Sequence, residues 1–134
     1  MAEHDNAATV RGLYDQLGQG DIDAMIGVMA EDVKWQLPEI DEVPLSGKRH
    51  GQDGVREFFT GLTDEHDLKE MKIDDVVAQG SAVVVLGHYC WHVKATDRSF
   101  SSDFAHVFHL TGGKIVRFQE YLDTAAVAAA YQAR

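Results

Sequence analysis

Apolar residues in the first half of the chain recur at helical spacing. Between residues 7 and 17 the intervals of three and four place one apolar face on a helix, formed by Ala7, Val10, Leu13, Tyr14 and Leu17. After Gly18, Asp21 is the expected N-cap of a second helix, whose stripe consists of Ile22, Met25, Ile26 and Met29. A third helix is predicted by Val55, Phe58, Phe59 and Leu62.

The rest of the chain has the period of β-structure. Val33, Trp35 and Leu37 alternate with polar residues, which predicts a strand. Residues 38–51 contain both prolines, and we expect a loop there that is long enough to form a lid or a rim. Four β-rich runs then follow, separated by turn signals, at residues 68–78, 82–94, 99–110 and 114–122.

The turns between these runs are short, so neighbouring strands can only be antiparallel. A last short helix is expected from Asp123 or Thr124 to Tyr131. The prediction is an α+β fold, with three N-terminal helices packed over the concave face of a cone-shaped, curved antiparallel β-sheet. The concave face then encloses a hydrophobic pocket. A second apolar sheet face, suggested by Val83, Val85, Tyr89, Trp91 and Val93, predicts a homodimer formed through the convex side.

Composition narrows the range of partners. With 134 residues, we expect one domain spanning residues 1–134. The formal net charge of -10 and the absence of a basic run argue against nucleic acid as a partner. The polar start of the chain and the lack of any apolar stretch near the length of a bilayer span argue against a signal peptide and a membrane partner. Together with a single cysteine, Cys90, these features predict a cytoplasmic protein.

The sequence contains seven histidines, which raises the question of whether some of them bind a metal ion. His88 and His92 are four residues apart, which in a strand separates them by about 13 Å, too far to share one ion. A metal site would instead need His88 and His106 to meet across neighbouring strands. We expect no metal site, and without a phosphate-binding glycine loop or a similar motif we expect no cofactor.

His106 and Glu120 are the candidate catalytic residues. His106 shares a predicted strand face with Phe104, Phe108 and Leu110, and a histidine on an apolar face is suited to acid/base chemistry. If the turn after residue 110 keeps simple pairing, Glu120 lies near His106, where a carboxylate fixes the imidazole tautomer and raises its basicity. The alternative is a core histidine that is hydrogen-bonded to a neighbour and has no catalytic role.

Several large side chains are expected to form the pocket wall. Trp35 lies at the end of a predicted strand beside the loop, a position that often lines an opening. The full set of predicted ligand-binding residues is Trp35, Phe59, His88 and Phe118.

Short segments spread along most of the chain resemble those of a known family. They lie at residues 20–25, 29–35, 51–59, 104–108, 113–116 and 120–124. In order and spacing the chain resembles the nuclear transport factor 2 superfamily of cone-shaped folds and, within it, the SnoaL-like proteins. This resemblance implies a single SnoaL-like domain over residues 1–134. It is less specific for activity, because the fold hosts unrelated functions.

Two enzyme groups of this fold can be compared position by position. The active-site positions of ketosteroid isomerases correspond to Leu13, to a position near Leu37 and to His106 in this sequence. At each of these positions the residue type differs from the one that family uses. SnoaL-type polyketide cyclases match better, since they place a histidine on the penultimate strand and an aspartate on the last, at a spacing that resembles His106 and Glu120.

Two functions follow from the sequence and the resemblance. One is a small-molecule-binding protein that acts as a cofactor-independent acid/base enzyme, of the isomerase, cyclase or dehydratase type, on a largely apolar ligand with a carbonyl group. The alternative is a non-catalytic ligand-binding or assembly module of the same fold. In the first case His106 is the acid/base residue and Glu120 is its partner or the base itself.

Overall fold

A computed structural model describes residues 2–132 of the chain. Residues 1, 133 and 134, the ends of the predicted 1–134 domain, lie outside the described residues. The helices and strands follow in the order α1 (Ala2–Gln19), α2 (Ile22–Gly27), β1 (Met29–Gln36), β2 (Lys48–His50), α3 (Gly51–Glu65), β3 (His66–Gln79), β4 (Ala82–Val93), β5 (Arg98–Thr111), β6 (Lys114–Leu122) and α4 (Thr124–Ala130).

Capping residues fix two of the helix starts that the sequence predicts. The Asp21 carboxylate accepts a hydrogen bond from the Ala24 N–H at the start of α2, and Asp123 does the same for the Ala126 N–H at the start of α4. Each cap satisfies a backbone donor that has no partner within its own helix.

The strands form a six-stranded sheet in the order β2-β1-β6-β5-β4-β3. Strands β3 to β6 make the predicted antiparallel meander. β1, however, pairs with β6 in the parallel sense, with Trp35 opposite Phe118. Pairing between strands so far apart in sequence leaves no local signal, which is why the prediction lacked it. The short β2, inside the predicted loop, pairs with β1 and was also missed.

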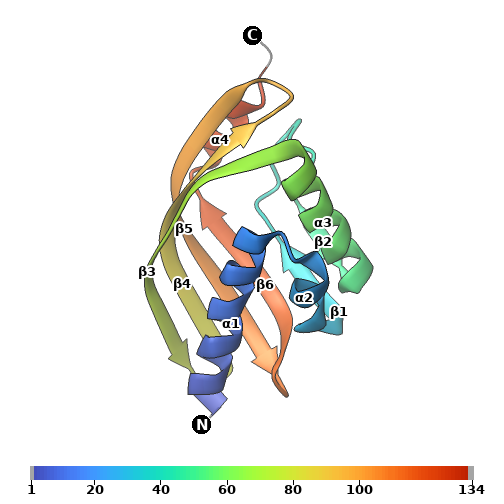
Figure 1. The fold of residues 1–134 in the computed structure, drawn as a ribbon, viewed down its shortest axis with the longest axis vertical. Helices are drawn as coiled ribbons and strands as arrows, with labels where there is room; N and C mark the ends of the chain where they lie inside the picture. Colours follow the sequence, from blue (N-terminus) through green and yellow to red (C-terminus); the bar gives the residue numbers. More distant parts are fainter. Residues whose placement is uncertain (1, 133–134) are drawn as a thin grey trace.

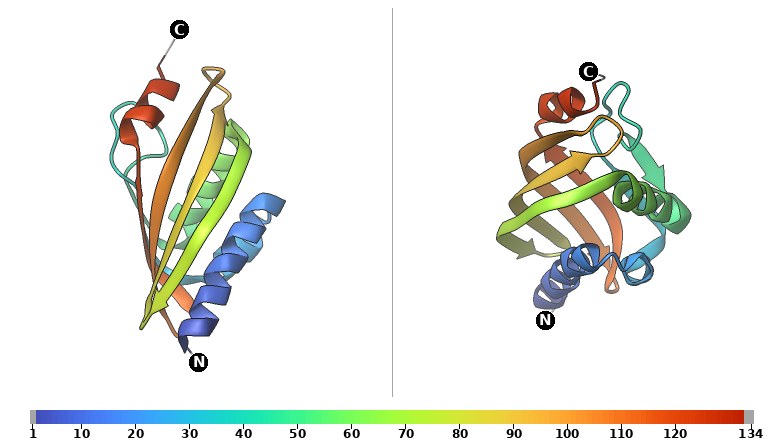
Figure 2. Two further views of the ribbon diagram at one scale, coloured as in Figure 1. Left: turned by 90° about the vertical axis from the view of Figure 1, so that its left-hand side faces the viewer. Right: turned by 45° about the horizontal axis from the view of Figure 1, so that its top comes forward.

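The helices cover the concave face of the curved sheet (Figures 1 and 2). α1 packs against β3 and β4, and α3 packs against β1 and β3. The apolar stripes predicted for these helices therefore face the sheet and form the core with it. No helix in the described range 2–132 is long and apolar enough to cross a membrane.

The structure corrects the assignment of one sheet face. The five residues that were expected on the convex side, Val83, Val85, Tyr89, Trp91 and Val93, are all buried within this one chain. Val85 lies directly opposite His106 in the β4–β5 ladder, and directly opposite residues face the same side of a sheet. The convex face instead exposes Val77, Leu86 and Tyr121. The argument for a dimer from the five residues was therefore wrong, although the dimer itself stays a prediction.

Candidate functional site

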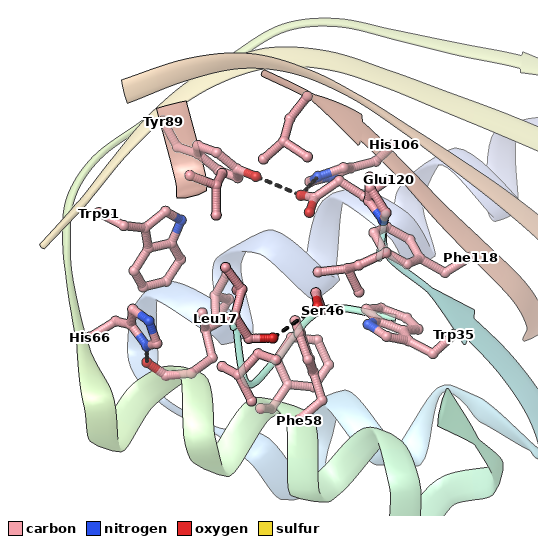
Figure 3. Close-up of a pocket in the computed structure, with 18 of the residues that line it drawn as sticks. Leu17, Trp35, Ser46, Phe58, His66, Tyr89, Trp91, His106, Phe118 and Glu120 are labelled. Carbon is pink, nitrogen blue, oxygen red and sulfur yellow. Dashed lines mark hydrogen bonds and ion pairs between the residues drawn. The ribbon is translucent and has the colours of Figure 1, made fainter. Parts of the chain in front are cut away.

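The concave face encloses a cavity of about 110 Å³ (Figure 3). Its wall is mostly aromatic and aliphatic and is built from α1, α3, α4, the sheet and the loop at residues 37–47. Ser46 ties this loop together, because its hydroxyl accepts a hydrogen bond from the Ile40 N–H and lies within hydrogen-bonding distance of the Val43 carbonyl. The predicted lid or rim thus lies directly on the cavity.

His106 and Glu120 occupy directly opposite positions in the β5–β6 ladder. His106 Nε2 lies 2.6 Å from Glu120 Oε2, and the two residues are only 6% and 7% exposed. Both line the cavity. The structure therefore brings the two candidate catalytic residues together on the concave face.

Two tyrosines extend this pair into a hydrogen-bonded chain. The Tyr14 hydroxyl lies 2.5 Å from His106 Nδ1, and the Tyr89 hydroxyl donates to Glu120 Oε2 at 2.6 Å. Burial and, next, the nearby charge of Glu120 raise the pKa of both tyrosines well above the usual value. Both hydroxyls therefore stay protonated and act as donors.

The hydrogen-bond partners of His106 fix the direction of each bond. A carboxylate oxygen accepts hydrogen bonds, so the His106 Nε2–H group is the donor in the bond to Glu120. His106 Nδ1 is then the acceptor for the Tyr14 hydroxyl. Both nitrogens of the imidazole are therefore engaged in hydrogen bonds within the protein.

Aromatic rings hold the imidazole in place. Phe104 stacks on it with ring centroids 4.0 Å apart, and Phe118 meets it at 5.1 Å. The Phe104 ring fits there because Gly87 has no side chain. A Cβ atom at Gly87 would lie 2.7 Å from the Phe104 ring and 2.3 Å from the Lys72 carbonyl oxygen.

Three of the four predicted wall residues lie on the cavity, namely Trp35, Phe59 and Phe118. The fourth, His88, was placed wrongly. It alternates with the buried Gly87 and Tyr89 along β4 and so points to the convex side, where it pairs with Asp103 at 2.9 Å. It cannot meet His106, whose direct partner on β4 is Val85.

Sequence reasoning missed four polar side chains at the cavity, namely Tyr14, Tyr89, His66 and Tyr131. Tyr14 belongs to the predicted apolar stripe of the first helix, which was a signal that it faces the sheet. Tyr89 was assigned to the wrong sheet face, and counting the β4–β5 register back from the turn would have corrected this, since Tyr89 lies opposite Ser102. No pattern along the chain indicates that His66 and Tyr131 meet.

Comparison with known proteins places this chain in a family. A profile of the SnoaL-like domain matches residues 10–118. Among solved structures, a nuclear transport factor 2-like protein from Burkholderia xenovorans LB400 is 28% identical, with a TM-score of 0.88 and coverage of 97% of this chain and 98% of that one. A second such protein, of unknown function, from Burkholderia pseudomallei K96243 is 29% identical, with a TM-score of 0.85 and coverage of 96% and 98%.

A more distant structure shares the fold alone. TerC, co-crystallised with polyporic acid, is 24% identical, with a TM-score of 0.83 and coverage of 95% of this chain and 98% of that one. No curated protein matches the chain. Because the profile covers most of the chain and the fold agrees with it over nearly the whole length, the chain belongs to the SnoaL-like domain family.

Proposed function

We propose that the cavity binds a small, largely apolar molecule with a carbonyl group, and that Glu120, positioned by His106, moves a proton on it. The observation that carries this proposal is the Tyr14–His106–Glu120–Tyr89 chain, which lies on the wall of an otherwise mostly apolar cavity. A buried carboxylate is costly to keep even with its hydrogen-bond partners, and apolar residues of similar size often stabilise a fold as well or better. A chemical role explains why the residues are nevertheless there.

Glu120 is the base in this proposal. Its Oε2 receives hydrogen bonds from His106 and Tyr89, and its second oxygen is the part of the carboxylate left to meet a ligand. The C–H bond next to the carbonyl breaks, the proton passes to Glu120, and the electron pair moves onto the carbonyl oxygen as an enolate. Return of the proton to the same carbon atom gives hydrogen exchange without a cofactor. In a ligand with a carbon–carbon double bond next to that carbon, the enolate is a dienolate, and return of the proton to the far end of the double bond completes an isomerisation.

His106 supports this step as a positioning residue, since both of its nitrogens are already bonded within the protein. It becomes the acid/base residue itself only if Tyr14 turns away from Nδ1. Protonation of Glu120 releases the Tyr89 hydroxyl from its role as a donor to the carboxylate. That hydroxyl is then available to the enolate oxygen, which favours the charged intermediate.

The size of the cavity limits the ligand. An apolar protein cavity of about 150 Å³ binds benzene, so a cavity of about 110 Å³ corresponds to a molecule of roughly one ring. TerC, which shares this fold, was co-crystallised with a small organic molecule, polyporic acid. A substituted ring such as an acetophenone is larger than benzene, so its binding would need the loop at residues 37–47 to move.

The second candidate function is a non-catalytic binding or assembly module. It is favoured by the same chain of hydrogen bonds, in which Tyr14, His106, Glu120 and Tyr89 already satisfy one another. A network of this kind rigidifies a core when every member is paired. In that case its loss reduces stability and leaves no chemistry to lose.

Exchange of hydrogen for deuterium separates the two functions. Acetophenone in D₂O exchanges its methyl protons through the same enolate, which proton NMR follows directly. We expect the protein to accelerate this exchange, and Glu120→Gln to reduce the acceleration by about 10²–10⁴-fold, as for the loss of a general base. Glu70→Gln is the control, because the Glu70 side chain is 61% exposed. If the wild-type protein binds acetophenone without accelerating the exchange, the base assignment is wrong and the binding module remains.

A further inference from the structure

A second polar pair lies on the cavity wall, away from Glu120. His66 begins β3 directly after α3, and Tyr131 follows α4. His66 Nδ1 lies 3.1 Å from the Leu62 carbonyl oxygen, and His66 Nε2 is hydrogen-bonded to the Tyr131 hydroxyl. Both residues line the cavity, and neither takes part in the hydrogen bonds around His106 and Glu120.

Aromatic side chains separate the two polar regions. Figure 3 shows Trp91 between His66 and Tyr89. The Trp91 ring meets that of His66 at 6.2 Å and that of Tyr89 at 6.2 Å, both edge to face. A ligand lying along this wall therefore has polar partners at both ends and apolar ones between them.

The hydrogen bonds define what the second pair can offer. A carbonyl oxygen only accepts, so His66 Nδ1 carries a proton. Burial lowers the pKa of His66, which keeps the ring neutral near pH 7 and leaves Nε2 as an acceptor. Tyr131 must then donate its own proton to His66. What remains unused is the lone-pair side of the Tyr131 oxygen, which is an acceptor.

We propose that His66 and Tyr131 form a second polar subsite, in which the Tyr131 oxygen accepts a hydrogen bond from a hydroxyl group of the ligand. This inference rests on the proposed function, because it assumes a ligand in the same cavity. The ligand class is a neutral molecule of about one ring, with a carbonyl group near Glu120 and a hydroxyl group at the opposite end. A carboxylate in place of the hydroxyl is disfavoured, since it would set a negative charge against lone pairs in a protein of net charge -10.

Three one-ring ketones test this subsite. 4-Hydroxyacetophenone can donate to Tyr131, 4-methoxyacetophenone has an oxygen in the same place without a donor, and acetophenone has neither. Titrations of the full chain followed by NMR give the three dissociation constants. We expect 4-hydroxyacetophenone to bind about 3–10-fold more tightly than the other two, as for one net hydrogen bond. Tyr131→Phe should reduce this preference to about 1, because its ring keeps the shape without the oxygen.

Tyr121→Phe is the matched control, because Tyr121 is 53% exposed on the convex face and its loss should leave the preference unchanged. The preference is a ratio within one protein, so a stability change in Tyr131→Phe does not affect it. Equal binding of all three ketones by the wild-type protein would overturn the subsite and leave the proposed function intact. If no ketone binds, the proposed function fails, and this inference fails with it.

Discussion

His106 Nε2 and Glu120 Oε2 are 2.6 Å apart across directly paired positions of β5 and β6. The pair sits among aromatic rings, with Phe104 stacked on the imidazole at 4.0 Å. Tyr14 and Tyr89 complete its hydrogen bonds from α1 and β4. One network of side-chain hydrogen bonds therefore links α1, β4, β5 and β6.

Removing one member of the pair leaves the other buried without its partner. His106→Ala should lower the free energy of unfolding by about 3–5 kcal/mol, because it takes a hydrogen-bond donor from the buried Glu120 carboxylate. Glu120→Ala should lower it by about 1–3 kcal/mol, because it leaves the His106 Nε2–H and the Tyr89 hydroxyl without their acceptor. The double variant should lose clearly less than the sum of the two, because the two residues share one interaction. Urea unfolding measures all three values. Glu70→Ala, at an exposed position, is the control, and additive losses would contradict the pairing.

Alkaline pH should destabilise the fold through Tyr89, which is buried, and through Tyr14 and Tyr131, which are half-buried. Burial raises the pKa of Tyr131 to about 12 and raises those of Tyr14 and Tyr89 well above the usual value of 10. A raised pKa means that the folded state holds protons that the unfolded chain releases. The stabilising effect is complete below pH 10 and is lost as the pH rises through 10 and beyond.

Urea unfolding at a series of pH values measures this loss. The free energy of unfolding should fall more steeply above pH 10 in the wild type than in the double variant with Tyr14→Phe and Tyr131→Phe. The Tyr121→Phe variant lacks the exposed tyrosine, so the tyrosinate absorbance of its folded state follows ionisation of Tyr14, Tyr89 and Tyr131 alone. Their ionisation at pH 10 without unfolding would contradict the prediction.

Much of the fold could be predicted because its signals are local. Helical spacing, the caps at Asp21 and Asp123, and the short turns between β3 and β6 each depend on neighbouring residues. The parallel pairing of β1 with β6 could not be predicted, because Trp35 and Phe118 meet only after the chain has folded. The outer sheet face was assigned wrongly because both faces of β4 are apolar, so that alternation alone does not tell them apart.

The candidate site could likewise be predicted only in part. Simple pairing onward from the β5–β6 turn, where Thr111 faces Lys114, would set Gln119 opposite His106. An irregularity beyond Leu110 shifts the register by one residue, so that Glu120 lies there instead. The sequence therefore indicated that His106 and Glu120 are close, but not that they pair directly. Tyr14 and Tyr89 reach the pair from elements whose positions depend on packing. His66 and Tyr131 are 65 residues apart along the chain. Their contact depends on where α4 docks after the last strand, and no short-range pattern encodes that.

Gly87 gives a test of how the imidazole is held. In Gly87→Ala the new methyl group would approach the Lys72 carbonyl to 2.3 Å and the Phe104 ring to 2.7 Å. We expect a loss of about 1–3 kcal/mol in the free energy of unfolding, as for overpacking, together with a displaced Phe104. NMR shifts of the His106 ring report that displacement.

Gly12→Ala is the matched control for this substitution. Gly12 lies inside α1, where a Cβ atom would meet nothing within 4 Å, and alanine favours a helix interior over glycine by about 0.5–1 kcal/mol. Gly12→Ala should therefore be neutral or slightly more stable. A Gly87→Ala variant that is equally stable and has unchanged His106 shifts would show that the close approach is relieved at no cost.

We also propose that the convex face pairs with a second copy of the chain. Leu86, Ala105 and Tyr121 lie directly opposite one another across β4, β5 and β6, and beside them Val77 is 56% exposed. Contiguous apolar residues on the outside of a sheet favour an interface, and a two-fold dimer would cover this row with the same row of a second copy.

Sedimentation velocity at micromolar concentration tests this proposal. We expect a dimer for the wild type and a monomer for Leu86→Asp, because a charge at the centre of the row would be buried without a partner. Thr60→Asp, on the exposed side of α3, is the control and should stay dimeric. A wild-type monomer would refute the pairing, and a dimer that survives Leu86→Asp would place the interface elsewhere. Because the cavity opens on the concave face, ketone binding should be the same in the Leu86→Asp monomer as in the dimer.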